Sequence, residues 1–211
     1  MFLNVHTHHF HAEETSIMSY NFGEATNHQQ IHSVGVHPYF WKGNPIDSTQ
    51  FERELVHSAA LGESGLDARS SEPIDNQRKL FLWQIELARV HHKTVIVHCV
   101  RAWGELFSVL KQYRRRVQFI IHNFNQNEFI LKELIRFDSG ISVGASIFNN
   151  TSNTRKLLSK IPIELLFIET DNNNCRVETL YQFLSQTLSI PVEKLQYHQL
   201  DNWKAFKLLD N

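Results

Sequence analysis

Six residues of this chain combine a side chain of a type that can bind divalent metal ions with a position where a short apolar run turns polar. His6 and His8 form a His-x-His pair. Side chains alternate along a strand with a period of two, so the pair points to one side. The other candidates end later apolar runs and are Glu63, His98, His122 and Asp171.

Four imidazoles and two carboxylates in one place predict a centre for two divalent metal ions, with Glu63 as the bridge between them. Imidazole-rich ligation favours Zn, Mn, Ni or Fe, while carboxylates and water leave Mg open. A chain with 13 histidines holds His-x-His pairs by chance, so the prediction rests on the joint arrangement. Other histidines are expected to be exposed or structural: His9, His11, His28, His32, His57, His91, His92 and His198.

The elements that must position these residues are eight short apolar runs, which we interpret as strands. In the second half of the chain the runs end near residues 98, 122, 144 and 170, the spacing of one strand plus one helix. Such a repeat predicts parallel strands, whose carboxyl ends meet on the active face of a (β/α)8 barrel. The predicted strands are Phe2–His6, Ile17–Phe22, Ser33–His37, Ala59–Glu63, Thr94–His98, Val117–His122, Gly140–Gly144 and Leu165–Glu169.

The fold class is therefore predicted to be α/β, a TIM-type (β/α)8 barrel that forms a single domain over residues 1–211. Between residues 8 and 33 there is room for one short strand and little else, so we expect reduced helices after the first strands. The predicted helices are Gln77–His92, Trp103–Arg114, Gln126–Phe137, Asn153–Lys160 and Arg176–Thr187, with one or two closing helices in Val192–Leu209.

The composition is that of an ordinary globular protein, with 42% hydrophobic residues and a formal net charge of -1. A near-zero charge argues against a globally basic nucleic-acid binder, so any nucleic-acid contact must be local. Two cysteines cannot form a disulfide framework. No secretory leader and no apolar stretch long enough to cross a membrane is present, so a cytoplasmic protein is expected.

Several short motifs occur in the order and with the approximate spacing of one known family. They are NVHTHHF, GVHPYF, LGESGLD, VIVHC followed by Arg-Ala, IIHNF, ISVGAS and LFIETD. On these motifs, from Phe2 to about Asn172, the chain resembles the TatD family of metal-dependent deoxyribonucleases. The resemblance implies a TIM-barrel hydrolase with a two-metal centre. It implies one metal held by His6, His8, Glu63 and Asp171, and a second held by Glu63, His98 and His122.

The chain departs from the family pattern around the strand ends. Asn4 stands where the family has Asp, and Tyr39 where it has the second His of Gly-x-His-Pro-His. The family's Arg after the fifth strand is shifted by one place, to Arg101. The usual His-Cys-Phe-Ser-Gly is HNFNQ, beginning at His122, and the Pro after Glu-Thr-Asp is missing. The metal residues are thus retained, while the loops expected to contact substrate differ.

Two neighbouring cations can activate a water and neutralise a phosphodiester, so no Ser or Cys nucleophile is required. Asp171 is the predicted general base, and Glu63 is the second predicted catalytic residue. The predicted substrate contacts are His37, Arg101, Arg69 and Trp103. A structural role stays open for His37, and a salt bridge that braces a loop stays open for Arg69.

Aromatic residues that follow strand ends are expected either to stack on bases or to be buried under loops. They are Phe40, Trp41, Trp103, Phe124 and Phe148. The basic run Arg114–Arg116 comes immediately before a strand, so we expect it on the opposite face of the barrel as solvated surface.

Three functions stay open. The first is hydrolysis of DNA phosphodiester bonds, exonucleolytic on single strands, because a barrel mouth accepts an end more readily than the middle of a duplex. The second is hydrolysis of amide, ester or lactone bonds, since related barrels place the same ligands around other substrates. The third is a subunit with partner-dependent or no activity, because shortened TatD-like proteins are associated with multi-gene bacterial defence cassettes of the Qat anti-phage type.

Overall fold

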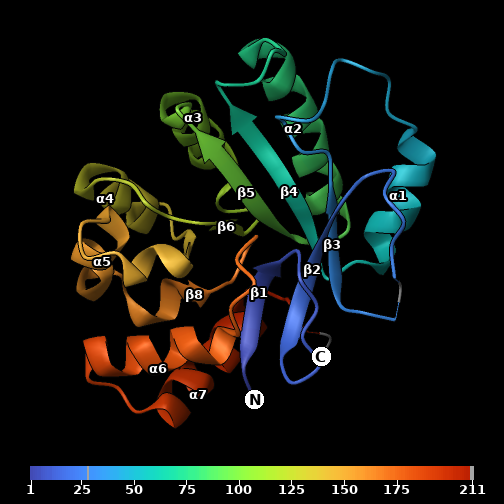
Figure 1. Ribbon diagram of the computed structural model, residues 1–211. Helices are drawn as coiled ribbons and strands as arrows, with labels where there is room; N and C mark the ends of the chain where they lie inside the picture. The colour runs from blue at the N-terminus through green and yellow to red at the C-terminus, as the bar shows by residue number, and fades with distance from the viewer. Residues whose placement is uncertain (28, 210–211) are drawn as a thin grey trace.

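The computed structural model describes residues 1–27 and 29–209. Its strands form one eight-stranded sheet in chain order, and every neighbouring pair is parallel. Figure 1 shows the strands around a common centre with helices outside them, which confirms the predicted barrel. The strands are β1 (Leu3–Thr7), β2 (Thr15–Asn21), β3 (His32–Gly35), β4 (Ala60–Asp67), β5 (Thr94–Val100), β6 (Phe119–Ile121), β7 (Gly140–Val143) and β8 (Leu166–Ile168).

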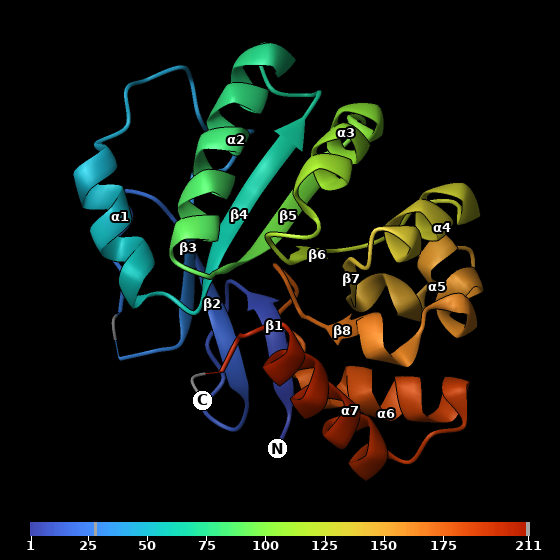
Figure 2. The same ribbon diagram turned by 180° about the vertical axis from the view of Figure 1, so that it is seen from behind.

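The helices cover the barrel unevenly (Figure 2). In the part of the chain that the structure describes, no helix lies between β1 and β2 or between β2 and β3, so the reduced helices after the first strands are confirmed. No described helix is long and apolar enough to span a membrane. The helices are α1 (Ser48–His57), α2 (Ile74–Val90), α3 (Trp103–Tyr113), α4 (Glu128–Arg136), α5 (Asn153–Leu157), α6 (Val177–Leu188) and α7 (Val192–Ala205).

Helix α1 was not predicted from the sequence. It buries only Phe51 and Leu55, four residues apart, so its apolar stripe is too narrow to stand out from a loop. The side chain of Asp47 caps its first turn by accepting a hydrogen bond from the Gln50 N–H at 3.0 Å. This cap was the local signal that could have revealed the helix.

Helix α2 uses two buried glutamines to hold the strand ends beside it. Gln84 Oε1 accepts the Val36 N–H at 2.8 Å, and Gln77 Oε1 accepts the Asp67 N–H at 2.8 Å. Both amides are buried, and they satisfy backbone N–H groups at the ends of the two strands. These contacts fix the carboxyl ends of β3 and β4, from which site residues project.

The sheet closes between β8 and β1. Thr7 and Asp171 form an isolated parallel bridge. The backbone N–H of Asp171 donates to His6 O at 3.0 Å, and its carbonyl accepts the His8 N–H at 3.1 Å. Strand β1 and the segment that follows β8 therefore meet at residues predicted to bind metal.

The opposite end of the barrel interior is filled by a compact apolar cluster. It joins interior residues of six strands to the C-terminal segment. A filled end leaves one open mouth, at the carboxyl ends of the strands. The cluster consists of Leu3, Val5, Ile17, Ala60, Ile96, Ile120, Phe167, Trp203, Phe206 and Leu208.

Candidate metal centre

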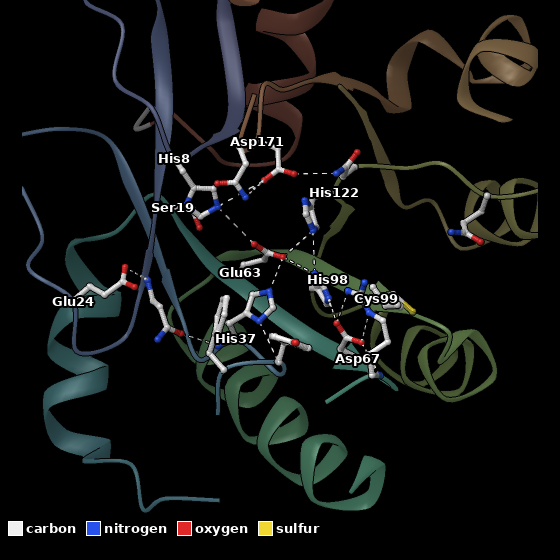
Figure 3. A pocket seen from close by; sticks show the side chains of 18 residues that line it. His8, Ser19, Glu24, His37, Glu63, Asp67, His98, Cys99, His122 and Asp171 are labelled. Atoms are coloured by element: carbon white, nitrogen blue, oxygen red, sulfur yellow. Dashed lines mark hydrogen bonds and ion pairs between the residues drawn. The ribbon is translucent and has the colours of Figure 1, made fainter. Parts of the chain in front are cut away.

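A cavity of about 510 Å³ opens at the carboxyl ends of the strands. Figure 3 shows histidines and carboxylates from separate strands pointing into it. The predicted site residues on its lining are His8, Glu63, His98, His122 and Asp171, joined by the predicted substrate contacts His37 and Arg69. His6 lies fully buried behind them.

An extra residue in β1 turns His6 into the barrel. The pairing of β1 with β2 shifts by one residue between Asn4 and Thr7. Val5 already packs in the interior cluster, so strict alternation would point His6 outward. A bulge reverses that alternation, as bulges beside active sites commonly do.

Strand β4 turns Glu63 inward in the same way. Its pairing with β5 shifts by one residue between Leu61 and Ser64. Ala60 faces the interior, so strict alternation would point Glu63, three places later, outward. Gly62 makes this possible: its φ is +148°, and a Cβ there would lie 2.7 Å from a backbone carbonyl oxygen of β5. In β5 and β6, by contrast, plain alternation from the interior isoleucines already points His98 and His122 inward.

Glu63 lies between two groups of imidazoles. Its Oε2 is 3.4 Å from His6 Nε2 and 4.0 Å from His8 Nε2. Its Oε1 is 2.6 Å from His98 Nδ1 and 2.8 Å from His122 Nε2. Each oxygen of one carboxylate thus faces a different set of nitrogens, which is the arrangement of a bridging ligand.

Asp171 completes the first group. Its Oδ1 lies 3.7 Å from both His6 Nε2 and His8 Nε2, and its Oδ2 accepts a hydrogen bond from Asn123 Nδ2 at 2.9 Å. Ligand atoms of His6, His8 and Asp171 all lie within 4.8 Å of one another. The same holds for the groups His6–Glu63–His122 and His37–Glu63–His98.

The charges of these buried groups depend on one another. Burial alone would lower the pKa of His6, but Asp171 and Glu63 outweigh it and raise that pKa to about 9. Burial opposes the charge of His122 as well, yet Glu63 raises its pKa well above the usual value. The pKa of Glu63, which burial would raise, is held well below its usual range by His122 and neighbouring imidazoles. Burial and the charge of His6 lower the pKa of His8.

The donor set suits divalent metal ions. Both ring nitrogens of His6 are buried, and neither has a hydrogen-bond partner among the described residues. Leaving such atoms unpaired is costly, and a cation bound between His6 and the carboxylates would satisfy Nε2. Neutral imidazoles together with carboxylates are the ligands that Zn, Mn, Ni and Fe accept. The clusters therefore form a plausible binuclear metal site.

His37 acts in this arrangement as a hydrogen-bond donor. Its Nδ1 accepts the Tyr39 N–H at 3.1 Å, so the ring proton lies on Nε2. That nitrogen is 3.0 Å from Glu63 Oε1 and donates to it. His37 therefore orients the central carboxylate, although its ligand atoms also fall within a metal-sized cluster.

Two buried carboxylates were not singled out from the sequence. Asp67 Oδ2 lies 2.9 Å from His98 Nε2 and leaves Nδ1 of that ring facing Glu63. Glu169 Oε1 accepts the Asn123 N–H at 2.5 Å and lies 3.7 Å from His122 Nδ1. Carboxylates that contact the far nitrogen of a metal-binding imidazole commonly fix its orientation. The sequence signal for both carboxylates was their position in the motifs, because Asp67 ends GESGLD and Glu169 begins ETD.

Replacing Asp67 with asparagine should weaken divalent metal binding about 10- to 100-fold, the usual effect of losing such a partner. Asp67 accepts hydrogen bonds from Arg69 through both carboxylate oxygens and contacts His98 Nε2 through Oδ2. One end of an asparagine amide is a donor and cannot accept, so the His98 ring loses its fixed orientation. Titration of the metal-free protein with Mn or Zn measures the change. Asp75→Asn, an exposed carboxylate in the first turn of α2, is the control. Equal affinities of Asp67→Asn and wild type would contradict the role.

The predicted substrate contacts occupy different environments. Arg69 lines the cavity and pairs with Asp67 at 2.9 Å, so it does brace the loop. Arg101 is exposed but is not among the residues that line the cavity. Trp103 packs against Phe107 at the start of α3, also outside the lining.

Two of the aromatic residues that follow strand ends pack against the rest of the protein. Phe124 is 1% exposed, so it belongs to the core and is unavailable for stacking. Phe148 packs edge-on against Phe183 at a centroid distance of 5.1 Å. His28 lies outside the described residues.

The basic run Arg114–Arg116 borders a smaller cavity with His92, Lys93 and Lys207, away from the residues of the mouth.

Asn4, at the position where the resemblance expects Asp, is buried and bonds to Thr170. It joins β1 to the segment after β8 below the metal cluster.

The chain is similar to curated relatives over most of its length. The family described as TatD related DNase matches residues 2–206. The uncharacterized metal-dependent hydrolase YjjV of Escherichia coli K12 is 28% identical over 155 residues, which cover 70% of this chain and 60% of that protein. The human 3'-5' RNA nuclease TATDN2 is 28% identical over 151 residues, 66% of this chain and 19% of that protein. In these sequence matches the aligned segment spans less than two thirds of either relative.

Solved structures show the same fold. The crystal structure of YjjV superimposes with a TM-score of 0.83 at 19% identity, covering 99% of this chain and 98% of that chain. A TatD family hydrolase of Entamoeba histolytica gives a TM-score of 0.75 at 14% identity, with 97% of each chain covered. Because the family match extends over nearly all described residues, the chain belongs to the TatD family of metal-dependent hydrolases.

Proposed function

We propose that this protein is a phosphodiesterase that uses two divalent cations to cleave single-stranded DNA from an end. The observation that carries the proposal is Glu63, whose two carboxylate oxygens face separate groups of imidazoles at the base of an open cavity. One carboxylate that bridges two cations is typical of centres that hydrolyse phosphate esters.

The residues of the site fall into two sets in this proposal. His6, His8 and Asp171 would hold the first cation, His98 and His122 would hold the second, and Glu63 would serve both. When bound, the cations neutralise the phosphodiester oxygens and lower the pKa of an attacking water. The Asp171 carboxylate, which lies on the cavity surface, accepts the proton of that water.

Two residues of the lining are suited to hold the substrate phosphate. His37 lines the cavity, and its Nε2 proton, which is donated to Glu63 Oε1 in this structure, becomes available to a phosphate when a cation takes up that oxygen. Arg69 is bound to Asp67 through Nε and one terminal nitrogen. Its side chain is still 53% exposed, which leaves other N–H groups to donate to a phosphate. Both donors are fixed by a carboxylate, so little conformational entropy is lost when substrate binds.

The family and the cavity support the proposed substrate class. The family description names DNases and a human relative is named an RNA nuclease, so a nucleic acid is the first substrate to test. A cavity of about 510 Å³ is in the size range of small-molecule sites. A cavity of this size suits the end of a single strand better than the interior of a duplex.

The test is hydrolysis by the purified protein loaded with Mn, Zn, Ni or Mg. Single-stranded and duplex DNA of one sequence, the matching RNA, and a set of amide, ester and lactone substrates should be compared. We expect terminal nucleotides to be released from single strands. Turnover of the amide, ester or lactone substrates alone would favour the second function considered above, and no turnover with any metal would favour a non-catalytic subunit.

Metal binding should release protons and should strengthen as the pH rises towards about 9. In the metal-free protein the pKa of His6 is raised to about 9, so the imidazole carries a proton at neutral pH. That proton must leave before Nε2 binds a cation. Below about pH 9, the apparent affinity for the metal should therefore fall about tenfold for each unit by which the pH is lowered and for each proton displaced. Calorimetry in buffers of different ionisation enthalpy measures the release, and a pH-independent affinity would contradict it.

A further inference from the structure

Three consecutive aromatic residues follow β3 at the rim of the cavity: Tyr39, Phe40 and Trp41. The backbone N–H groups of Phe40 and Trp41 both donate to His37 O, at 3.2 and 3.1 Å. The segment is therefore attached to the histidine that donates to Glu63. Even so, Phe40 is 62% exposed and Tyr39 is 42% exposed. Contiguous exposed apolar rings at the rim of a cavity often mark a binding site.

Phe40 and Trp41 border different hollows. Phe40 lines the cavity of the metal centre, with its ring centroid 4.8 Å from that of His37. Trp41 lines a second, outer groove of about 390 Å³ between the loop after β3 and helix α2. Trp83 and Leu80 of α2 form the opposite wall of that groove. The segment thus separates the candidate centre from an adjoining apolar groove.

The indole of Trp41 has its polar edge satisfied inside its own loop. Nε1 donates to Asn44 O at 2.8 Å. The half-buried ring therefore needs no further hydrogen bond, and what it can offer a ligand is apolar surface. Planar apolar surface beside a polar catalytic cavity suits a nucleobase, which has a π face of its own.

Positive charges accompany the aromatic residues. Lys42 Nζ lies 5.5 Å and the Arg69 guanidinium carbon 5.8 Å from the centroid of the Tyr39 ring. Lys79 lines the groove and is exposed. Aromatic rings with interleaved cations are the recurring device of single-strand binding, because rings stack on bases while cations follow the phosphates.

From this juxtaposition we infer that Tyr39–Trp41 is a base-stacking platform for a single strand whose end lies at the metal centre. One base stacks on Phe40 inside the cavity, and a neighbouring base stacks on Trp41 in the outer groove. Lys42 and Lys79 lie along the phosphates between and beyond them. Paired bases of a duplex have their faces covered by their neighbours, so the platform selects single strands. The inference rests on the proposed function and adds the residues that determine strand specificity.

The test compares a labelled oligothymidylate with an abasic strand of the same length, which carries the same phosphates without bases. Binding is followed by fluorescence anisotropy in EDTA, which prevents hydrolysis. Base stacking on one aromatic side chain contributes about 5- to 150-fold to affinity. We expect wild type to bind oligothymidylate more tightly, and Phe40→Leu and Trp41→Leu each to lose about tenfold for it. Neither change should alter abasic-strand affinity.

The controls separate stacking from folding. Tyr197→Leu removes an aromatic side chain that is 69% exposed on α7, far along the chain, and should change neither affinity. Trp41→Phe keeps a ring in the groove and should restore much of the loss. Circular dichroism and the melting temperature verify the fold of each variant.

Several outcomes would overturn the inference. Equal affinity of wild type for both strands would overturn it, as would a parallel loss of both affinities in the platform variants. If the wild type nevertheless hydrolyses DNA, the proposed function stands without the platform. Absence of both binding and hydrolysis of any nucleic acid would refute the proposed function and the platform together.

Discussion

Replacing His6 and His8 together with alanine should remove most of the divalent metal that the purified protein carries. We expect roughly one to two ions per wild-type chain, as a binuclear centre implies. The two imidazoles supply two of the four groups that surround the first position, next to Asp171 and Glu63. Loss of a group that only orients a ligand costs about 10- to 100-fold in affinity, so loss of two ligands should cost more than about 100-fold.

Elemental analysis after mild purification, followed by titration with Mn and Zn, measures this loss. The matched control is the double variant His57→Ala/His92→Ala, which removes two exposed histidines and should keep the metal. His6 is fully buried, so the single variant His8→Ala, at a partly exposed side chain, tests the site without a buried cavity. Wild-type protein that holds no metal and binds none on titration would refute the centre.

The second prediction separates Asp171 from Glu63. Asp171→Asn should keep much of the affinity for single-stranded oligonucleotides, because Glu63, His98 and His122 remain to hold the second cation. Turnover should fall about 10²- to 10⁴-fold, the usual effect of removing a general base. Asparagine keeps an oxygen that can face His6 and His8 but has no carboxylate to take up a proton.

Glu63→Gln should behave differently. The carboxylate faces both groups of imidazoles, so its loss weakens both positions, and oligonucleotide binding and turnover should fall together. Binding and hydrolysis are measured for both variants at one fixed metal concentration. Asn123→Asp tests Asp171 from outside the cluster, because it replaces the amide that donates to Asp171 with a carboxylate that cannot donate. Wild-type turnover in Asp171→Asn would remove that residue from the mechanism.

The sequence was sufficient for the barrel and for the positions of the six candidate residues. His98 and His122 follow from alternation alone, because each stands two residues after an interior isoleucine of its strand. For His6 and Glu63 the same rule fails. Alternation from the interior residues Val5 and Ala60 would place both side chains on the outer face of the sheet. These residues were found because they end apolar runs, while the bulges that turn them inward depend on pairing with neighbouring strands. Pairing geometry has only a weak local signal, here Gly62.

Contacts between distant segments account for the other differences. Asp67 is important because it lies against His98 of the next strand. Phe124 is buried by the segment that follows β7, whose Thr154 bonds to its carbonyl. None of these relations is local in sequence, so spacing alone could not reveal them.

The closure of the sheet at Thr7 and Asp171 has a consequence for how the protein matures. His6 and His8 are synthesised before strands β2 to β8, whereas Asp171 follows only after all eight strands have been made. A cation shared by these three side chains can be captured at full strength only once the two ends of the sheet have met, since the unfolded chain must pay the entropy of closing that long loop. Acquisition of metal at this position would therefore report that the two ends of the sheet have met, and a half-folded product would be distinguished by its inability to retain the ion.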